Sequence, residues 1–194
     1  MAYNAELKAD DIIFEKMMFI NVRDSLILKP ILGDNFENEA TMFLNNSNND
    51  GVKKYLKAVY VTSQEEAVKK LHNFMLKTVV KTSLFYCIMI VNTEIVIGYI
   101  HLNSPLSASG LNSWSVDFWI SDKFARQNIM TVALGYMLEY LQNNQVPQIV
   151  ALVDEMNLPS IKVLQKLGFR LDHKESGGEE RLFFVINLNS IIYG

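Results

Sequence analysis

Two long apolar runs joined by a short polar segment constrain this fold more than any other feature. SLFYCIMIV occupies residues 83–91 and IVIGYIHL occupies residues 95–102, with a polar Asn-Thr-Glu segment between them. Such runs, separated by only a few polar residues, predict an antiparallel hairpin. Because neither run alternates apolar with polar residues, we expect both faces of these strands to be covered.

The rest of the chain mixes further strands with helices. Strands are predicted at 25–30, 113–120 and 148–153, and in a final hairpin that turns at Gly177-Gly178. Helices are predicted at 10–20, 35–44, 64–75, 129–141 and 157–168. The third follows a capping box at Ser63 to Glu66, the fourth has one apolar face, and the fifth has Asn157 near its N-cap and Gly168 as its C-terminal stop. The polar stretch NNSNNDG at 45–51 predicts a loop. Early hairpins followed by a βαβα order indicate a mixed sheet, in the α/β or α+β class.

Bulk properties exclude several classes of protein. The 194 residues fit one domain, and a net charge of -3 argues against a general nucleic-acid binder. No apolar run is long enough to span a membrane, and the first residues lack the basic segment of a secretory signal, so a cytoplasmic location is expected. The single cysteine, Cys87, excludes an internal disulfide, and the isolated histidines predict no metal site.

A strand, a loop and a helix follow one another at FWISDKFARQNIMTVAL, from residue 118 to residue 134. This order is typical of phosphate-binding loops, because a helix N-terminus carries free N–H donors and a partial positive charge. Such loops usually contain glycine, and this one contains none. Asn128 is the residue of the loop that best tolerates a positive φ, so a turn is expected there. Arg126 and Gln127 supply side-chain donors.

Several motifs taken together resemble the GNAT N-acetyltransferase superfamily, within it the RimJ/RimL-like branch of ribosomal-protein alanine acetyltransferases. NLPSIKVLQKLGF at 157–169 is similar to the signature N-x-x-S-x-x-x-L-x-K-x-G-F. VIGYIHL and VDFWISD resemble the third and fourth strands of that family, and IMTVAL resembles its helix start. The resemblance extends from SLILKP at 25–30 to the final hairpin. It implies an N-acetyltransferase domain at 25–194, preceded by a helical extension at 1–24.

The resemblance implies an acyl-CoA N-acyltransferase fold, with helices on both faces of a mixed sheet whose fourth and fifth strands splay apart. Acetyl-CoA, the co-substrate, would enter between these strands, with its pantetheine on the edge of the fourth strand and its pyrophosphate on the loop and helix start at 125–131. The cofactor-binding residues implied in this way are Trp119, Ile120, Arg126, Gln127, Asn128, Ile129, Met130, Thr131 and Asn157.

The resemblance also implies catalytic roles. Ser160 matches the serine that protonates the departing CoA thiolate in this branch, and Leu164 stands where many relatives carry the tyrosine that does so. The resemblance does not identify the general base as clearly as it identifies Ser160. Asp117 interrupts an apolar strand and must be paired or face water. Glu179 and Glu180 are alternatives, whereas His101 is more typical of the edge of a core.

The expected activity is acetyl transfer from acetyl-CoA to a primary amine, by direct attack in a ternary complex. The acceptor would be a protein N-terminus or a small-molecule amine, and the protein a monomer or homodimer. The alternative is a non-catalytic module of the same fold that senses acyl-CoA or binds proteins, which the glycine-free loop at 125–131 would suit.

Overall fold

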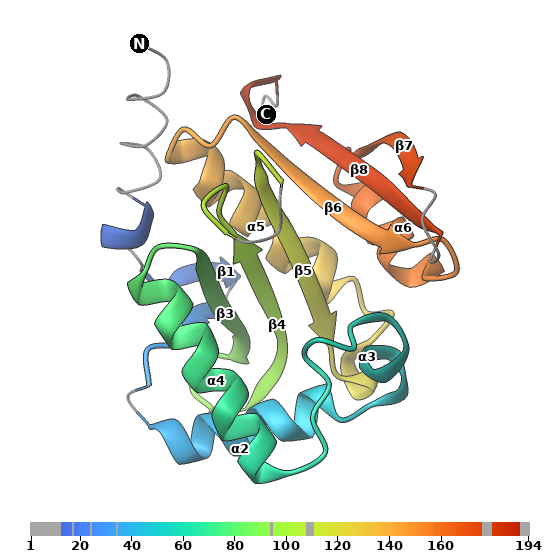
Figure 1. The fold of residues 1–194 in the computed structure, drawn as a ribbon. Coiled ribbons are helices and arrows are strands. Elements are labelled where there is room, and N and C mark those ends of the chain that lie inside the picture. Colours follow the sequence, from blue (N-terminus) through green and yellow to red (C-terminus); the bar gives the residue numbers. More distant parts are fainter. Residues whose placement is uncertain are drawn as a thin grey trace.

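The protein is built on a single mixed sheet (Figure 1). The computed structural model describes residues 13–16, 18–23, 25–33, 35–93, 95–107, 111–175 and 180–190. The strands are β1 (Ile20–Arg23), β2 (Leu26–Pro30), β3 (Ser83–Ile90), β4 (Val96–Asn103), β5 (Trp114–Ile120), β6 (Gln148–Asp154), β7 (Arg170–Glu175) and β8 (Arg181–Asn187). The helices are α2 (Phe36–Ser47), α3 (Asp50–Tyr55), α4 (Gln64–Val79), α5 (Ile129–Asn143) and α6 (Leu158–Lys166), with short 3-10 turns η1 (Asp122–Phe124) and η2 (Leu188–Ser190).

The strand order across the sheet is β1-β2-β3-β4-β5-β6-β8-β7. Neighbouring strands are antiparallel throughout, except for β5 and β6, which are parallel. The predicted hairpin of β3 and β4 is present, with Ser83 opposite Asn103 at its open end. The mixed sheet confirms the predicted fold class.

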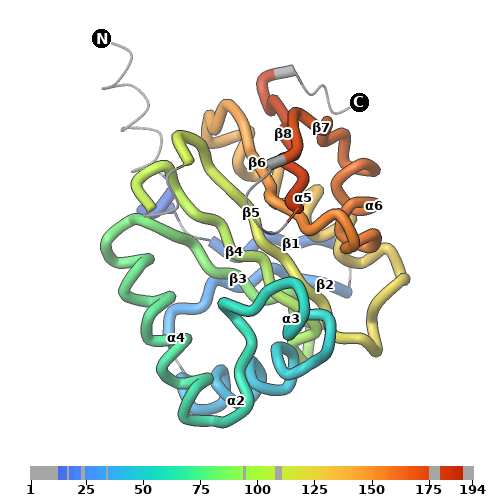
Figure 2. Tube along the Cα trace, turned by 45° about the vertical axis from the view of Figure 1, so that its right-hand side comes forward, coloured from blue at the N-terminus to red at the C-terminus, as the bar shows by residue number. Residues whose placement is uncertain are grey.

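Helices cover both faces of the sheet, as Figures 1 and 2 show. Ala40 and Phe43 of α2 and Leu71 of α4 pack with Phe85 and Tyr99 of the sheet on one face. The buried side of α5 packs on the other face, together with Leu164 of α6. The predicted apolar face of α5 is therefore confirmed, and its buried residues include Met130, Ala133, Leu134, Met137 and Leu141. No helix among the described residues is both long and apolar enough to cross a membrane.

The parallel strands β5 and β6 separate soon after they start. Their pairing consists of Trp114 with Ile149 and Ser115 with Val150. Beyond these pairs β5 continues to Ile120 and stays paired with β4, while β6 stays paired with β8. Figure 1 shows the two strands diverging, and we call the region between them the split. These are the fourth and fifth strands of the predicted family pattern, which does not count β1.

The N-terminal segment differs from the predicted helix over residues 10–20. Helix is present at residues 13–15, whereas Ile20 begins β1, which pairs with β2 in the same sheet. Residues 10–12 lie outside the described residues. The apolar residues of this stretch still reach the core, since Ile13 and Phe14 are both buried. Pairing with β2 gives the end of the segment extended geometry, which a helical reading of its apolar residues does not anticipate.

The loop predicted at 45–51 is wrong, because most of this stretch is helical. Helix α2 continues to Ser47, and α3 begins at Asp50. The Asn46 amide donates to the carbonyl oxygens of Met42 and Val96, so it ties α2 to β4. The Asn49 side chain accepts from the Val52 amide and thereby caps α3. These asparagines anchor and cap helices. Composition alone cannot distinguish asparagines in that role from asparagines in a loop.

Candidate functional site

The edge of β5 that faces the split is the first part of the site. Ser121 donates its backbone N–H to the carbonyl oxygen of Ile97 at 2.8 Å, so the odd-numbered residues of β5 direct their backbone groups toward β4. Because backbone direction alternates along a strand, Phe118 and Ile120 direct their N–H and C=O groups toward β6. Pairing with β6 has ended before these residues. The strand thus offers an unpaired edge that an extended molecule could join.

Trp119, a predicted cofactor-binding residue, does not face the split. Its side chain is buried with Phe43 and Tyr99, whose rings are centred 6.1 and 5.2 Å away. Its backbone faces Tyr99 in β4. The structure therefore places Ile120 at the split, together with Phe118, which is not among the predicted cofactor-binding residues. A cofactor contact of Trp119 stays a prediction.

The loop between η1 and α5 contains the left-handed turn predicted at Asn128 and a second left-handed residue, Arg126, that was not predicted. Asn128 has φ 61°, as expected for the asparagine, and Arg126 has the same φ of 61°. Both side chains are exposed, as is that of Gln127. The Gln127 side chain donates to the carbonyl oxygen of Lys123 at 3.1 Å and so braces the loop from within. Asn128 is left-handed and is followed directly by the right-handed residues of α5, the alternation found in anion-binding nests.

Helix α5 begins without a cap. The side chain of its N-cap residue, Asn128, makes no hydrogen bond to the first turn, and that turn contains no acidic residue. Each of α2, α3 and α4 has an acidic residue in its first turn, and α6 has a side-chain cap. The N–H groups of Ile129, Met130 and Thr131 are thus available to an anion. The Met130 side chain is buried in the core, so its backbone is the part that could serve.

Helix α6 places the signature residues on the β6 side of the split. The Asn157 side chain accepts from the Ser160 amide at 3.4 Å, which confirms the predicted cap, and the Ser160 side chain is half-buried in the first turn. Gly168 ends this region with φ +85°, as predicted. Lys166 donates to Oδ1 of Asn128 at 3.3 Å, which links α6 to the loop before α5. Lys166 belongs to the signature but is not among the predicted site residues.

Asp117 lies on β5 at the start of the split, two positions beyond the last residue paired with β6. Its Oδ2 atom is 3.4 Å from Nδ1 of His101 and accepts from the Asn103 amide at 3.4 Å. Its side chain is 40% exposed, so it also meets solvent. Glu180, one alternative base, pairs on the surface with Lys174 at 2.9 Å. The other, Glu179, lies outside the described residues.

Cys87 lies in the middle of β3 and is not placed to act as a nucleophile. It is 1% exposed, and burial raises the pKa of its thiol to about 12. A thiol with that pKa stays protonated at neutral pH, and the thiolate is the reactive form. Within the described ranges, no three His, Cys, Asp or Glu side chains gather in a group that could hold a metal ion.

A contact across the mouth of the split was not foreseen from the sequence. The Tyr55 hydroxyl of α3 donates to the carbonyl oxygen of Met156 at 3.1 Å. Met156 belongs to the turn between β6 and α6, next to Asn157. Figure 1 shows α3 near the ends of β5 and β6. The sequence did not predict α3, because its first two residues belong to the asparagine-rich stretch that predicted a loop.

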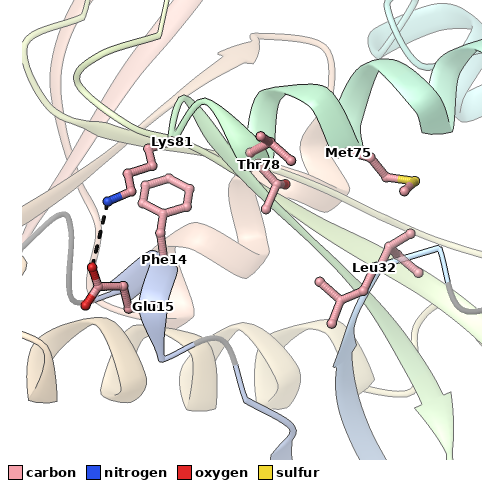
Figure 3. Close-up of a pocket in the computed structure, with 8 residues that line it drawn as sticks. Phe14, Glu15, Leu32, Met75, Thr78 and Lys81 are labelled. Atoms are coloured by element: carbon pink, nitrogen blue, oxygen red, sulfur yellow. Dashed lines mark ion pairs between the residues drawn. The ribbon is translucent and has the colours of Figure 1, made fainter.

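Figure 3 shows an apolar cavity and the residues that line it. It has a volume of about 290 Å³ and is lined by Phe14, Glu15, Ile31, Leu32, Met75, Thr78, Val79 and Lys81. None of these residues belongs to the predicted site. The Lys81 ammonium lies 4.0 Å from the Glu15 carboxylate at one side of the cavity. The open strand edge and the uncapped helix are therefore the features that define the candidate site.

Solved structures of ribosomal-protein acetyltransferases share this fold. The RimL ribosomal L7/L12 alpha-N-protein acetyltransferase in complex with coenzyme A is 18% identical, with a TM-score of 0.76 over 90% of this chain and 100% of that chain. A Salmonella typhimurium enzyme that modifies the N-terminal serine of L7/L12 is 18% identical, with a TM-score of 0.71 over 88% of this chain and 99% of that chain. The Vibrio fischeri ribosomal-protein-S5-alanine acetyltransferase is 14% identical, with a TM-score of 0.71 over 89% and 98%.

At the level of sequence, no curated protein gives a significant match. A family assignment is nevertheless clear from the pattern of residues along the chain. Residues 26–170, well over half of the sequence, match the family described as acetyltransferase (GNAT) domain. With its split sheet and its signature helix α6, the protein therefore belongs to the GNAT acetyltransferase family.

Proposed function

We propose that this acetyltransferase moves an acetyl group from acetyl-CoA to a primary amine in a ternary complex. The observation that carries the proposal is the split, where β5 loses its partner strand after Ser115 and exposes the backbone of Phe118 and Ile120. An extended pantetheine chain has amide groups that suit such an edge. The uncapped start of α5, which follows β5 after η1 and a short loop, suits the pyrophosphate.

The phosphate-binding role rests on both backbone and side chains. The free N–H groups at 129–131 and the helix dipole favour an anion, while Arg126 adds a positive charge on the same loop. Lys166 adds a second positive charge through its contact with Asn128. These groups explain how a chain with a net charge of -3 would hold a polyanionic co-substrate. Asn157 would contact the co-substrate from the β6 side.

The chemistry would use one group from each side of the split. The acceptor nitrogen attacks the thioester carbonyl carbon, the C–S bond breaks, and an amide and CoA are formed. Asp117 on β5 would take the proton that the amine loses, and the Ser160 hydroxyl on α6 would give a proton to the departing thiolate. Asp117 and Trp119 face the helices α2 and α4, because side chains alternate along β5. The acceptor would therefore approach from that face.

A thermal-shift titration with acetyl-CoA and desulfo-CoA tests the binding step. A ligand that binds only the folded protein at 100 times its Kd adds about 2.7 kcal/mol of stability, so the unfolding midpoint should rise with either compound. An unchanged midpoint at millimolar acetyl-CoA would rule the proposal out.

The transfer step is tested by thiol release with a panel of primary amines. The panel would include a peptide with an N-terminal serine, a peptide with an N-terminal alanine, a polyamine and an amino sugar. We expect thiol release with at least one of them, above the rate of acetyl-CoA hydrolysis without amine. Cys87 is buried and should not contribute to the colorimetric signal from native protein. Binding of acetyl-CoA without release of thiol for any amine would favour the non-catalytic acyl-CoA sensor instead.

A further inference from the structure

Two side chains of β4 converge on a single oxygen of Asp117. His101 lies directly opposite Asp117 in the register of β4 and β5, and Asn103 is the next β4 residue on the same face. The His101 Nδ1 atom and the Asn103 Nδ2 atom each lie 3.4 Å from Oδ2 of Asp117. Oδ1 has no partner among the residues that the structure describes. The carboxylate is thus held on one side only.

His101 is buried in a way that fixes which nitrogen carries its hydrogen. The residue is 5% exposed, and its ring lies among aromatic side chains, 4.8 Å from Phe74 and 5.9 Å from Phe85 between centroids. Its Nε2 atom is buried and has no partner within the described part of the chain. A buried N–H without an acceptor costs more than a buried lone pair without a donor. The hydrogen therefore belongs on Nδ1, where it faces Asp117.

We infer that His101 and Asn103 are positioning residues for the general base. Their donors hold Oδ2 of Asp117 and leave Oδ1 as the atom that takes the proton from the acceptor amine. The inference rests on the proposed function, because it gives Asp117 a proton to accept. Contacts of 3.4 Å are long for hydrogen bonds, and such contacts in free enzymes shorten when substrates bind.

Kinetics of paired variants test this role. His101→Leu removes the donor, whereas His101→Asn keeps one near the position of Nδ1. We expect His101→Leu to lower kcat about 10- to 100-fold with an unchanged KM for acetyl-CoA, the scale of loss that follows a misplaced catalytic group. His101→Asn should retain more of the activity. The substrate would be the most reactive amine of the panel described above.

A double-mutant cycle separates positioning from general damage to the fold. If His101 acts through Asp117, then His101→Leu should cost almost nothing more once Asp117→Asn is present. Losses that multiply in the double variant would overturn the inference. Asn103→Ala provides a second cycle should His101→Leu fail to fold, since Asn103 is only part-buried. Thermal unfolding of every variant checks that the fold is retained.

The surface pair of His173 and Asp172 is a matched control. Nδ1 of His173 lies 2.8 Å from Oδ2 of Asp172, but both side chains are at least half exposed and far along the sheet on β7. His173→Asn and Asp172→Asn should leave kcat unchanged. An equal loss of activity in these variants would show that the assay responds to any histidine–aspartate pair.

NMR decides the inference even if no amine reacts. The chain has three histidines, so ¹⁵N signals of His72, His101 and His173 can be assigned by substitution. Long-range ¹H–¹⁵N spectra should show the Nδ1–H tautomer for His101, and Asp117→Ala should shift its Nδ1 signal while Asp172→Asn should not. A hydrogen on Nε2 of His101, or an Nδ1 signal that does not shift in Asp117→Ala, would refute the arrangement. A failed transfer assay with the expected spectra would instead count against the proposed function.

Discussion

At the scale of single residues, Gly98 determines where the free part of β5 lies. A Cβ atom at this position would stand 2.6 Å from the carbonyl oxygen of Trp119 and 3.1 Å from Cα of Ile120, both of them backbone atoms. Real Cβ contacts do not come this close, so an added methyl group would have to push β5 away from β4. Gly98 thereby allows β5 to follow β4 while it leaves β6.

We expect Gly98→Ala to lower the free energy of unfolding by about 1–3 kcal/mol, the usual range for overpacking, and to weaken acetyl-CoA binding. Urea unfolding and calorimetric titration measure the two effects. Gly135→Ala is the control, because its Cβ would meet only Leu167 Cδ2 at an ordinary 3.5 Å inside α5. That change should stabilise the protein by about 0.5–1 kcal/mol. Equal effects of the two changes would disprove this role of Gly98.

Asn128 and Arg126 share the same backbone conformation but differ in what their side chains offer. Both have φ 61°, which glycine adopts without strain. Asn128→Gly should therefore bind acetyl-CoA at least as tightly as the natural protein, although it loses the contact with Lys166. Arg126→Gly gains the same backbone freedom but loses a positive charge, and it should bind more weakly. Calorimetric titration of both variants separates the two effects, and weaker binding by Asn128→Gly would contradict the prediction.

At the scale of elements, the unpaired edge of β5 makes a prediction about amide exchange. The N–H groups of Phe118 and Ile120 face the split, whereas those of Trp119 and Ser121 face β4, and Ser121 donates to Ile97. Acetyl-CoA should slow hydrogen exchange at Phe118 and Ile120 and change little at Trp119 and Ser121. Residue-resolved exchange by NMR measures this. Uniform protection along the strand would argue against an edge-on contact.

Much of the element order could be predicted from the sequence. Apolar runs identified β2 to β6 and β8, because each is bounded by polar or turn-forming residues, and β7 was predicted as the partner of β8 in the final hairpin. Asn157 and Gly168 marked the limits of the last helical region. The asparagines at 45–49 misled because their amides cap and anchor helices through contacts that are distant in sequence. The strand geometry of Ile20 depends on β2 in the same way.

The candidate site could be predicted only where it is local in sequence. The turn at Asn128 and the cap at Asn157 depend on neighbouring residues, and both were predicted. The group around Asp117 depends on the register of β4 against β5, across a connection of some ten residues whose length gives no register. His101 therefore could not be linked to Asp117 in advance. The same holds for Tyr55 and Met156, which are 101 positions apart.

At the scale of the whole molecule, the two apolar cores lie on opposite faces of one sheet. Trp114 belongs to the core under α5, and Trp119 belongs to the core under α2 and α4. These are the only tryptophans in the sequence. Strands β3, β4 and β5 supply side chains to both cores. Loss of these strands would therefore disrupt both cores at once. Unfolding should therefore be a single cooperative event.

Trp114→Phe and Trp119→Phe each leave one tryptophan, which reports on one core. In each variant, we expect the fluorescence midpoint in urea to coincide with the midpoint from far-UV circular dichroism, because shared strands couple the two faces. Acetyl-CoA bound at the split should raise both midpoints together, since stabilisation of a two-state protein is felt throughout the molecule. Separate transitions for the two tryptophans, or a rise in midpoint confined to one of them, would show that the two cores unfold independently.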